Sequence, residues 1–182
     1  SVEFILKTDR LGLRNWKAAD VAPFVAMGKD SEVMRFFPKP LSAKASEDLI
    51  QRFLQHFLLH GFTYFAVERL DTSEFIGFTG FMHQNFESRF TPCVDIGWRF
   101  KTTAWGKGYA TEAATACLNA AHEKFHLTEV FSLAPEINQA SIAVMKRIGM
   151  TYDHSFIHPS LSENSSLNPC SVYKKIVTTK AS

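Results

Sequence analysis

The sequence predicts an α/β protein with a mixed β-sheet, and three observations support this prediction. Apolar side chains recur at helical spacing before residue 60, whereas residues 64–100 form short β patterns separated by turns. A glycine-rich turn and a long alanine-rich segment of helical character come next. From residue 129 onward, β patterns flank one further helical segment, so the order of elements is β-α-α-β-β-β-α-β-α-β-β.

The N-terminal part is expected to contain one strand and then helices. Residues 11–14 alternate apolar and polar side chains and predict the strand. The segments with apolar residues at helical spacing are 20–27, 31–37 and 49–57. Ser42 or Ser46 can cap the last of these helices and Gly61 can end it, because serine and glycine favour those positions.

Three strands are expected in the middle of the chain. The β-like segments are 64–68, 75–81 and 92–100. Neighbouring strands joined by short turns pair most simply as hairpins, so these segments predict a meander. Glycines inside the second strand indicate a bulge or a close approach of a neighbouring backbone.

The rest of the chain predicts two helices and three strands. Gly108 precedes a helix whose apolar stripe is rich in alanine, which indicates close packing on the sheet. A strand at 129–133 leads to a helix that Asn138 can cap. The last two strands are expected at 150–157 and 171–177, joined by a polar loop.

Length and composition indicate one globular domain spanning residues 1–182. The chain is 46% hydrophobic and 21% charged, and it has no basic run that would favour a nucleic-acid partner. No segment approaches the roughly 18 apolar residues of a membrane span, so we expect no membrane partner. The N-terminal residues lack the pattern of a signal peptide, and we expect a cytoplasmic protein.

The three cysteines lie far apart, at Cys93, Cys117 and Cys170. An odd number without paired spacing argues against a disulfide framework and fits a reducing compartment. The sequence contains no CxxC motif and no cluster of histidine with cysteine, so we expect no metal.

The segment 105–111 carries the strongest indication of a ligand. It places Gly106-Lys107-Gly108 between a β segment and the start of the alanine-rich helix. The first N–H groups of a helix have no partner within it, and with the helix dipole they favour a phosphate. Gly-x-Gly alone also fits a tight turn, and the spacing of a Walker loop is absent, which disfavours a nucleotide-phosphate site.

Several separated motifs resemble one family, the GNAT N-acetyltransferases. Residues 106–111 are similar to the loop that binds the pyrophosphate of acetyl-CoA. Asn138-x-x-Ser141, followed by residues 146–150, resembles a later motif of the ribosomal-protein N-acetyltransferase (RimJ/RimL-like) branch. Segments near both ends resemble that branch too, namely 8–14, 31–37 and 158–173. The resemblance covers nearly the whole chain and implies a GNAT fold with a mixed, mostly antiparallel central sheet flanked by helices.

The resemblance implies that acetyl-CoA is the co-substrate. The pantetheine arm would pair with the backbone of one strand and approach Asn138, while the glycine turn would hold the pyrophosphate. The residues expected to bind acetyl-CoA are Trp98, Arg99, Phe100, Trp105, Gly106, Lys107, Gly108, Tyr109, Ala110, Thr111, Asn138 and Arg147.

Acetyl transfer also needs groups that move protons. An alkylammonium, with a pKa of about 10.4, must lose a proton before it attacks, and the leaving thiolate benefits from a donor. Many GNAT enzymes carry a tyrosine seven residues after the motif asparagine, but here Met145 takes that place. We therefore expect Ser141 to act as the acid and Asp95 as the base, directly or through water. The alternatives are that Ser141 only bonds the helix backbone and that Asp95 is a solvated strand carboxylate.

The acceptor is expected to bind near the N-terminal helices. Arg35 and Phe37 are candidates for its pocket, with a core patch as the alternative. His83, near the end of a strand, is a candidate for substrate contact, although a lone histidine there is more often a surface residue. Loops at 85–91 and 158–170 would also shape the acceptor specificity.

These observations predict one function and leave one rival. The predicted function is an enzyme that transfers acetyl from acetyl-CoA to a primary amine by direct attack on the thioester. The acceptor would be a protein N-terminus or a small amine, and the protein a monomer or homodimer. The rival is a GNAT-like module that binds acyl-CoA without catalysis, as a sensor or scaffold, and Met145 in place of tyrosine favours it.

Overall fold

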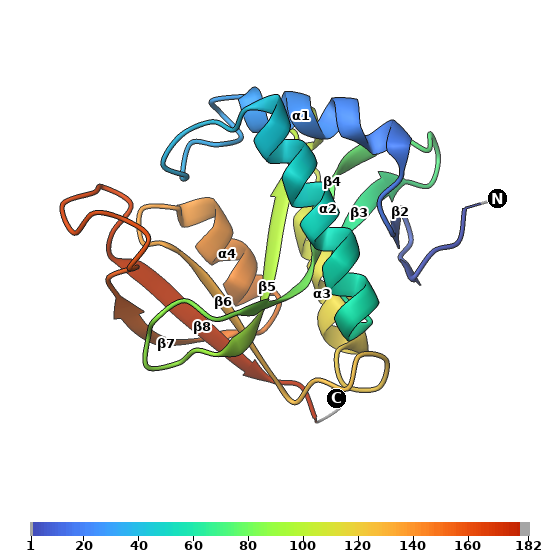
Figure 1. Cartoon of the computed structure of the whole chain (residues 1–182). Coiled ribbons are helices and arrows are strands. Elements are labelled where there is room, and N and C mark those ends of the chain that lie inside the picture. The colour runs from blue at the N-terminus through green and yellow to red at the C-terminus, as the bar shows by residue number, and fades with distance from the viewer. Residues whose placement is uncertain (1, 179–182) are drawn as a thin grey trace.

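Eight strands form a single sheet in the computed structural model of the protein, which describes residues 2–178 (Figure 1). Across the sheet the strands follow the order β1-β2-β3-β4-β5-β6-β8-β7. The strands are β1 Leu6–Lys7, β2 Leu11–Arg14, β3 Tyr64–Arg69, β4 Phe75–Gln84, β5 Cys93–Phe100, β6 Glu129–Pro135, β7 Thr151–Phe156 and β8 Cys170–Ile176. The helices are α1 Val21–Lys29, α2 Ala43–His60, α3 Tyr109–Ala120 and α4 Gln139–Arg147, with short 3₁₀ helices at Ala18–Asp20 and Thr102–Ala104. The expected domain of residues 1–182 includes residues 1 and 179–182, which lie outside the described residues.

The sheet is antiparallel except at one junction, so the predicted mixed fold class and the central meander are confirmed. β5 and β6 run parallel and share the single register pair Asp95 and Phe131. One residue further, Ser132 Oγ donates to the carbonyl oxygen of Ile96 at 2.9 Å. From this point the carboxyl ends of both strands line a cavity.

Two clusters of buried side chains lie on the two faces of the sheet. On one face, α3 contributes its alanine-rich stripe, where Ala113 belongs to the same cluster as Phe100 of β5. On the other face, α1 and α2 enclose an aromatic cluster around Trp16 that includes Phe53 and Phe78. Figure 1 shows α2 and α3 on opposite sides of β3 and β4. The small side chains of α3 allow it to pack closely on the sheet, as the sequence predicts.

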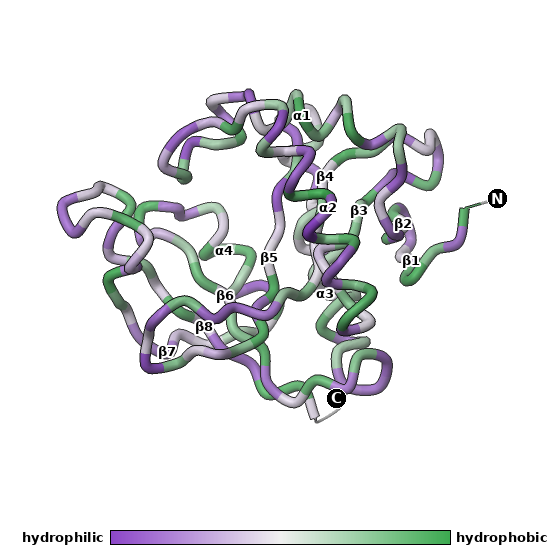
Figure 2. The backbone as a smooth tube through the Cα atoms, viewed as in Figure 1, coloured by the Kyte–Doolittle hydropathy of each residue, from purple (hydrophilic) through white to green (hydrophobic). Residues whose placement is uncertain are grey.

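α2 follows its sequence signals at both ends. Ser42 Oγ accepts a hydrogen bond from the backbone N–H of Ala45 at 3.1 Å, so Ser42 rather than Ser46 is the cap. Gly61 ends the helix with φ of 78°, in the left-handed region. Figure 2 shows hydrophobic and hydrophilic residues alternating around this helix, which fits one apolar face on the sheet.

The glycines of β4 permit close approach of the neighbouring strands. A Cβ atom on Gly80 would lie 2.0 Å from the carbonyl oxygen of Thr63, and one on Gly77 would lie 2.3 Å from that of Arg99. The pairing of β3 with β4 also shifts register once. Both features predicted from these glycines are therefore confirmed.

The helix predicted over 31–37 is wrong. This segment forms successive turns, in which the N–H of Phe37 donates to the carbonyl oxygen of Met34 at 3.0 Å. Pro38 disfavours helical geometry at the residue before it, and the short segment cannot sustain a helix. The short strand β1 was not predicted by any pattern.

The three cysteines are free thiols. Burial raises the pKa of Cys117 to about 12, so this residue packs in the core rather than acting as a nucleophile. None of the helices in the described part of the chain combines the length and apolar character needed to cross a membrane.

Candidate active site

A cavity of about 1010 Å³ opens where β5 and β6 diverge. Its walls come from the carboxyl halves of both strands, the turn before α3 and the start of α4. The segment 32–38 and residues of the loop 158–170 complete the lining. A cavity of this size holds a ligand as large as a nucleotide cofactor.

The glycine turn forms one part of the wall. Gly106 and Gly108 have φ values of 75° and 78°, which glycine adopts without strain. A Cβ atom on Gly106 would meet nothing within 4 Å, so the turn is open. Gly108 is the N-cap of α3 and provides no side-chain cap, so the first N–H groups of this helix remain available to a ligand.

Residues from the β1–β2 turn hold the glycine turn in place. Arg10 donates to the carbonyl oxygen of Lys107 at 2.9 Å and to the carboxylate of Glu112 at 2.8 Å. Thr8 Oγ1 donates to the same carboxylate at 2.6 Å. Burial by itself would raise the pKa of Glu112, but the bonds from Thr8 and Arg10 lower it overall. This brace joins residues 102 positions apart, so no local pattern in the sequence could reveal it.

Most residues predicted to bind acetyl-CoA line the cavity. They are Trp98, Arg99, Phe100, Trp105, Gly106, Gly108, Tyr109, Ala110, Thr111, Asn138 and Arg147. Lys107 is the exception, because its Nζ donates to the carbonyl oxygen of Thr103 at 2.8 Å, away from the lining residues. The open backbone of the turn, rather than the Lys107 charge, is thus what the geometry offers to an anion.

β5 presents different residues to the two faces of the sheet. Ile96, Trp98 and Phe100 pack with the cluster that contains α3. Asp95 and Arg99 contact side chains of the other cluster. Because alternate residues of a strand point to opposite faces, these two charged side chains lie across β5 from α3.

Asp95 is a buried carboxylate with a tyrosine partner. Tyr64 Oη donates to Asp95 Oδ1 at 2.7 Å. Gly97 makes room for this contact, since a Cβ atom there would lie 2.8 Å from Tyr64 Oη. Burial raises the pKa of Asp95 to about 7, although its hydrogen bonds, including the one from Tyr64, lower it in part. A carboxylate with this pKa can exchange protons near neutral pH.

Tyr64 was missed by the sequence analysis, in which it was only the first residue of a strand. Burial and the neighbouring Asp95 raise the pKa of Tyr64 well above its usual value of 10, so it remains a protonated donor. Its ring stacks on Phe78, with centroids 5.1 Å apart. Tyr64 therefore holds the Asp95 carboxylate in a fixed position.

The start of α4 lies on another wall of the cavity. Asn138 Oδ1 accepts from the N–H of Ser141 at 3.2 Å, which confirms the predicted N-cap. Ser141 lines the cavity from the first turn of the helix. Met145 is almost completely buried one turn further along and has no proton to donate.

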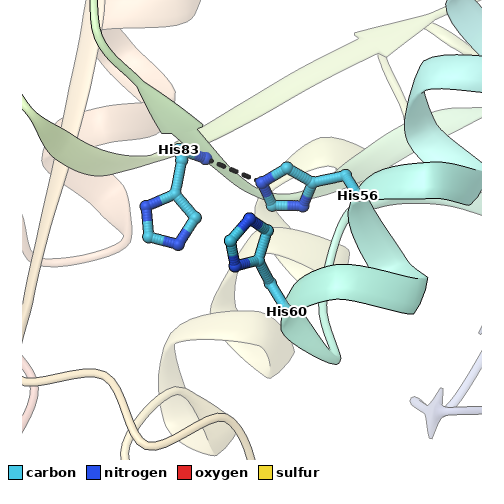
Figure 3. A group of neighbouring side chains, drawn as sticks. All are labelled: His56, His60 and His83. Carbon is cyan, nitrogen blue, oxygen red and sulfur yellow. Dashed lines mark hydrogen bonds between the residues drawn. The ribbon is translucent and has the colours of Figure 1, made fainter.

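The predicted acceptor residues fall into two groups. Arg35 and Phe37 line the cavity. His83 does not, because its side chain lies beside His56 and His60 at the end of α2, as Figure 3 shows. The geometry thus does not support a contact between His83 and the acceptor. His158, which was not predicted, lines the cavity from the loop after β7, and burial lowers its pKa.

Comparison with known proteins agrees with this geometry. Residues 10–151 match the family model described as an acetyltransferase (GNAT) domain. The chain is 30% identical over 148 residues to the uncharacterized protein YkkB of Bacillus subtilis (strain 168), covering 81% of this chain and 85% of YkkB.

Solved structures share the fold. An acetyltransferase from Agrobacterium tumefaciens has a TM-score of 0.78 and 26% identity, covering 96% of this chain and 95% of the other. A RimL ribosomal-protein α-N-acetyltransferase in complex with coenzyme A has a TM-score of 0.77 and 16% identity, covering 96% of this chain and 98% of the other.

Proposed function

The chain belongs to the GNAT acetyltransferase family and is an N-acetyltransferase, and we propose that it transfers the acetyl group of acetyl-CoA to a primary amine by direct attack on the thioester. One observation carries this proposal. An uncapped helix start with an open glycine turn lines the same cavity as a buried carboxylate with a pKa of about 7. The helix start and the glycine turn suit the pyrophosphate of acetyl-CoA. The carboxylate suits the removal of a proton from the acceptor amine.

Acetyl-CoA is proposed to bind along the α3 side of β5. The backbone N–H groups of residues 106–111 would hold the pyrophosphate, since helix N-termini favour anions. Arg147 lines the cavity and supplies a positive charge. The backbone of residues 98–100 would pair with the pantetheine arm, which would extend toward Asn138.

Asp95 is proposed to take the proton of the acceptor amine, directly or through water. An alkylammonium has a pKa of about 10.4 and cannot attack until it is deprotonated. The free amine then forms a bond to the thioester carbonyl carbon, and the carbon–sulfur bond breaks to release the CoA thiolate. Because no group of the enzyme is acylated in between, positioning of the two substrates supplies much of the rate.

Ser141 is proposed to donate a proton or a hydrogen bond to the departing thiolate. Ser141 lines the cavity at the start of α4, in the same helix where Met145 cannot serve as a donor. The rate of this step gains from a donor that is already in place when the charge develops on sulfur.

For the acceptor we propose a class of molecule, and for the family we propose a branch. The acceptor is a protein N-terminus or a small amine, held in part by Arg35 and Phe37. The fold shared with the RimL enzyme supports a RimJ/RimL-like assignment. We further propose a cytoplasmic protein with one domain over residues 1–182, a monomer or homodimer whose acetyl transfer uses no metal.

The rival function is acyl-CoA binding without catalysis. Met145 at the position of the usual tyrosine favours it. The carboxylate of Asp95, whose pKa is suited to proton transfer, favours catalysis.

Thermal denaturation with acetyl-CoA, followed by an assay of CoA release, tests both functions. A ligand that binds only the folded state adds about 2.7 kcal/mol of stability at a hundredfold excess over Kd. Stabilisation together with CoA release in the presence of an amine supports the proposal. Stabilisation without release from any amine supports the rival, and no stabilisation at saturating acetyl-CoA contradicts both.

A further inference from the structure

Arg99 is a partly buried cation, and two of its three guanidinium nitrogens are fully enclosed. Its Nε and Nη1 atoms are enclosed and unpaired within the described part of the chain. The guanidinium carbon lies 4.3 Å from the ring centroid of Phe37 and 5.3 Å from that of Phe78. Aromatic faces stabilise a cation, but they do not satisfy its N–H groups.

The positive charge of Arg99 therefore has no anionic partner among residues 2–178 that would stabilise it. Burial lowers the pKa of Arg99 to about 10, so the side chain remains positive at neutral pH. An isolated buried charge is unfavourable, and a buried arginine is normally paired with a carboxylate. Since Arg99 lines the cavity, a bound molecule can supply the missing partner.

The position of Arg99 on β5 indicates which molecule this is. Arg99 contacts Phe78 on the face that also holds Tyr64 and Asp95. The glycine turn and α3 pack on the opposite face, where the pyrophosphate is proposed to bind. Phe37, which contacts Arg99, comes from the segment that lines the acceptor side. The partner of Arg99 is therefore on the acceptor rather than on acetyl-CoA.

We propose that Arg99 binds a carboxylate of the acceptor, so that the acceptor is a primary amine that also carries a carboxylate. This inference rests on the proposed acetyl transfer. Arg99 and Asp95 are four residues apart on one strand, which separates their Cα atoms by about 13 Å. The amine near Asp95 and the carboxylate near Arg99 are thus several bonds apart, as in an ω-amino acid or a short acidic peptide. An arginine pairs with a carboxylate through a planar fork of N–H donors, which gives selectivity over a neutral amide.

Matched acceptors test the role of Arg99 in specificity. The probes are a series of ω-amino acids with the corresponding ω-amino amides, and the C-terminally amidated dipeptides Ala-Glu-NH2 and Ala-Gln-NH2. For the wild-type enzyme we expect kcat/KM to favour each carboxylate over its amide roughly tenfold or more. Arg99→Met should remove this preference, because KM for the carboxylates should rise relative to KM for the matching amides. Arg99→Lys should keep only part of it, because lysine lacks the fork. A preference among the ω-amino acids would indicate an ω-amino acid as the acceptor, and a preference between the dipeptides would indicate a short acidic peptide.

A binding measurement decides the inference even if no amine is acetylated. Calorimetry with N-acetyl-6-aminohexanoate and its amide, on protein saturated with CoA, requires no turnover. Tighter binding of the carboxylate that disappears in Arg99→Met supports the inference, whatever the fate of the acetyl-transfer proposal. Equal binding of both compounds by the wild type, or an unchanged preference in Arg99→Met, overturns it. Transfer to amides as readily as to carboxylates overturns the role of Arg99 while leaving acetyl transfer intact.

A separate observation concerns three histidines outside the cavity lining. His56 and His60 are four residues apart on α2 and so share one side of the helix, and His83 lies opposite them near the end of β4 (Figure 3). One ring nitrogen from each lies within 4.8 Å of the others. The ring centroids of His60 and His83 are 4.2 Å apart.

The hydrogen bonds of His56 define its tautomer. Its Nδ1 lies 2.8 Å from the carbonyl oxygen of Phe62, which can only accept, so Nδ1 carries the proton. Its Nε2 accepts from the backbone N–H of His83 at 3.1 Å and therefore has a lone pair (Figure 3). A ring N–H held by a backbone carbonyl is the arrangement that orients histidine ligands in metal sites.

We infer that His56, His60 and His83 form a binding site for a divalent first-row ion such as Zn²⁺ or Ni²⁺, for which imidazole is a suitable ligand. Zinc–nitrogen bonds of 2.0–2.1 Å place tetrahedral ligands about 3.4 Å apart, so the exposed His60 and His83 would shift by about an ångström. The ion would bind His56 Nε2, which in its absence accepts a hydrogen bond from the backbone N–H of His83. That N–H would then donate to water, because it lies at the exposed end of β4. A bound ion would join the end of α2 to β4. No metal was expected from the sequence because it has no CxxC motif and no cluster of histidine with cysteine, and these three histidines come from two separate elements.

Calorimetric titration of Zn²⁺ into the chelator-treated full chain tests this site. We expect saturable binding of one ion to the wild type, and binding weaker by roughly tenfold or more in His60→Gln and His83→Gln. His122→Gln, at an exposed histidine outside the cluster, should bind like the wild type. Absence of saturable binding to the wild type overturns the inference. Equal affinity of the wild type and both cluster variants also does so, because the ion then binds elsewhere.

Discussion

Arg14 is almost completely buried and Arg99 is partly buried, and their surroundings are opposite. Arg14 donates to Asp20 at 2.8 and 3.0 Å and also to Glu68, and all three side chains are almost completely enclosed. Arg99 meets two aromatic rings, and its Nε and Nη1 have no partner. Burial would lower the pKa of Arg14, yet its two carboxylates raise it overall, whereas burial lowers that of Arg99 to about 10.

The difference separates a structural charge from a charge at a binding site. Arg14 joins β2, the start of α1 and β3, and its N–H groups are matched within the protein. Arg99 lines the cavity together with Asp95, whose burial likewise disfavours its charged form. A fold tolerates such groups where a ligand compensates them, so unmatched buried charges identify the site.

Arg14→Met should have the largest effect. It would leave Asp20 and Glu68 buried without their cation, and loss of one partner from a buried ion pair costs about 3–5 kcal/mol. The free energy of unfolding from urea denaturation measures this loss. Arg69→Met, at an exposed pair with Asp71, is the control and should change stability little. A similar small change in both variants would contradict the structural role of Arg14.

Asp95→Asn should stabilise the protein in a pH-dependent way. The folded-state pKa of Asp95 is raised from 3.8 to about 7. Folded protein therefore holds a proton there that unfolded protein releases, and the stability from this group falls as the pH rises from 3.8 through 7. The stability of the variant relative to wild type should therefore increase between pH 5 and pH 8, by at most about 3 kcal/mol.

Denaturation of both proteins at the two pH values tests this, and an equal difference at both would contradict the raised pKa. The same variant should lose most acetyl transfer, and wild-type kcat/KM should rise with pH through about 7. Wild-type activity in Asp95→Asn would remove Asp95 from the mechanism.

Arg99→Met should stabilise the protein by about 1 kcal/mol, because it replaces an unmatched, partly buried charge with an apolar side chain of similar length. The same urea denaturation gives this value. A loss of stability as large as that of Arg14→Met would show that Arg99 is matched within the folded protein, and the comparison would fail.

Ser141→Ala should change stability least, within about 0.5 kcal/mol, since its N–H rather than its hydroxyl meets the Asn138 cap. Turnover should fall roughly a hundredfold with little change in acetyl-CoA affinity, if Ser141 assists the leaving thiolate. Steady-state kinetics and calorimetry separate the two quantities. Wild-type turnover would assign Ser141 to the helix cap alone.

The sequence predicted those parts of the site that depend on local conformation. The glycine turn, the start of α3 and the Asn138 cap are set by backbone preferences of a few consecutive residues, and they lie where the pattern placed them. The segment 31–37 shows the limit of such patterns, because a following proline and the shortness of the segment prevented the predicted helix.

The tertiary structure alone decided which distant groups meet. The bracing of the turn by Arg10, the contact of Tyr64 with Asp95 and the unmatched charge of Arg99 all depend on strand register and on which face a side chain occupies. The histidine cluster likewise requires α2 to end beside β4. Burial shifts the pKa of Asp95 and Arg99. It arises only when the chain packs, so no local sequence pattern could predict it. The sequence therefore determined the turn and the caps, and packing determined the chemistry of the charges around them.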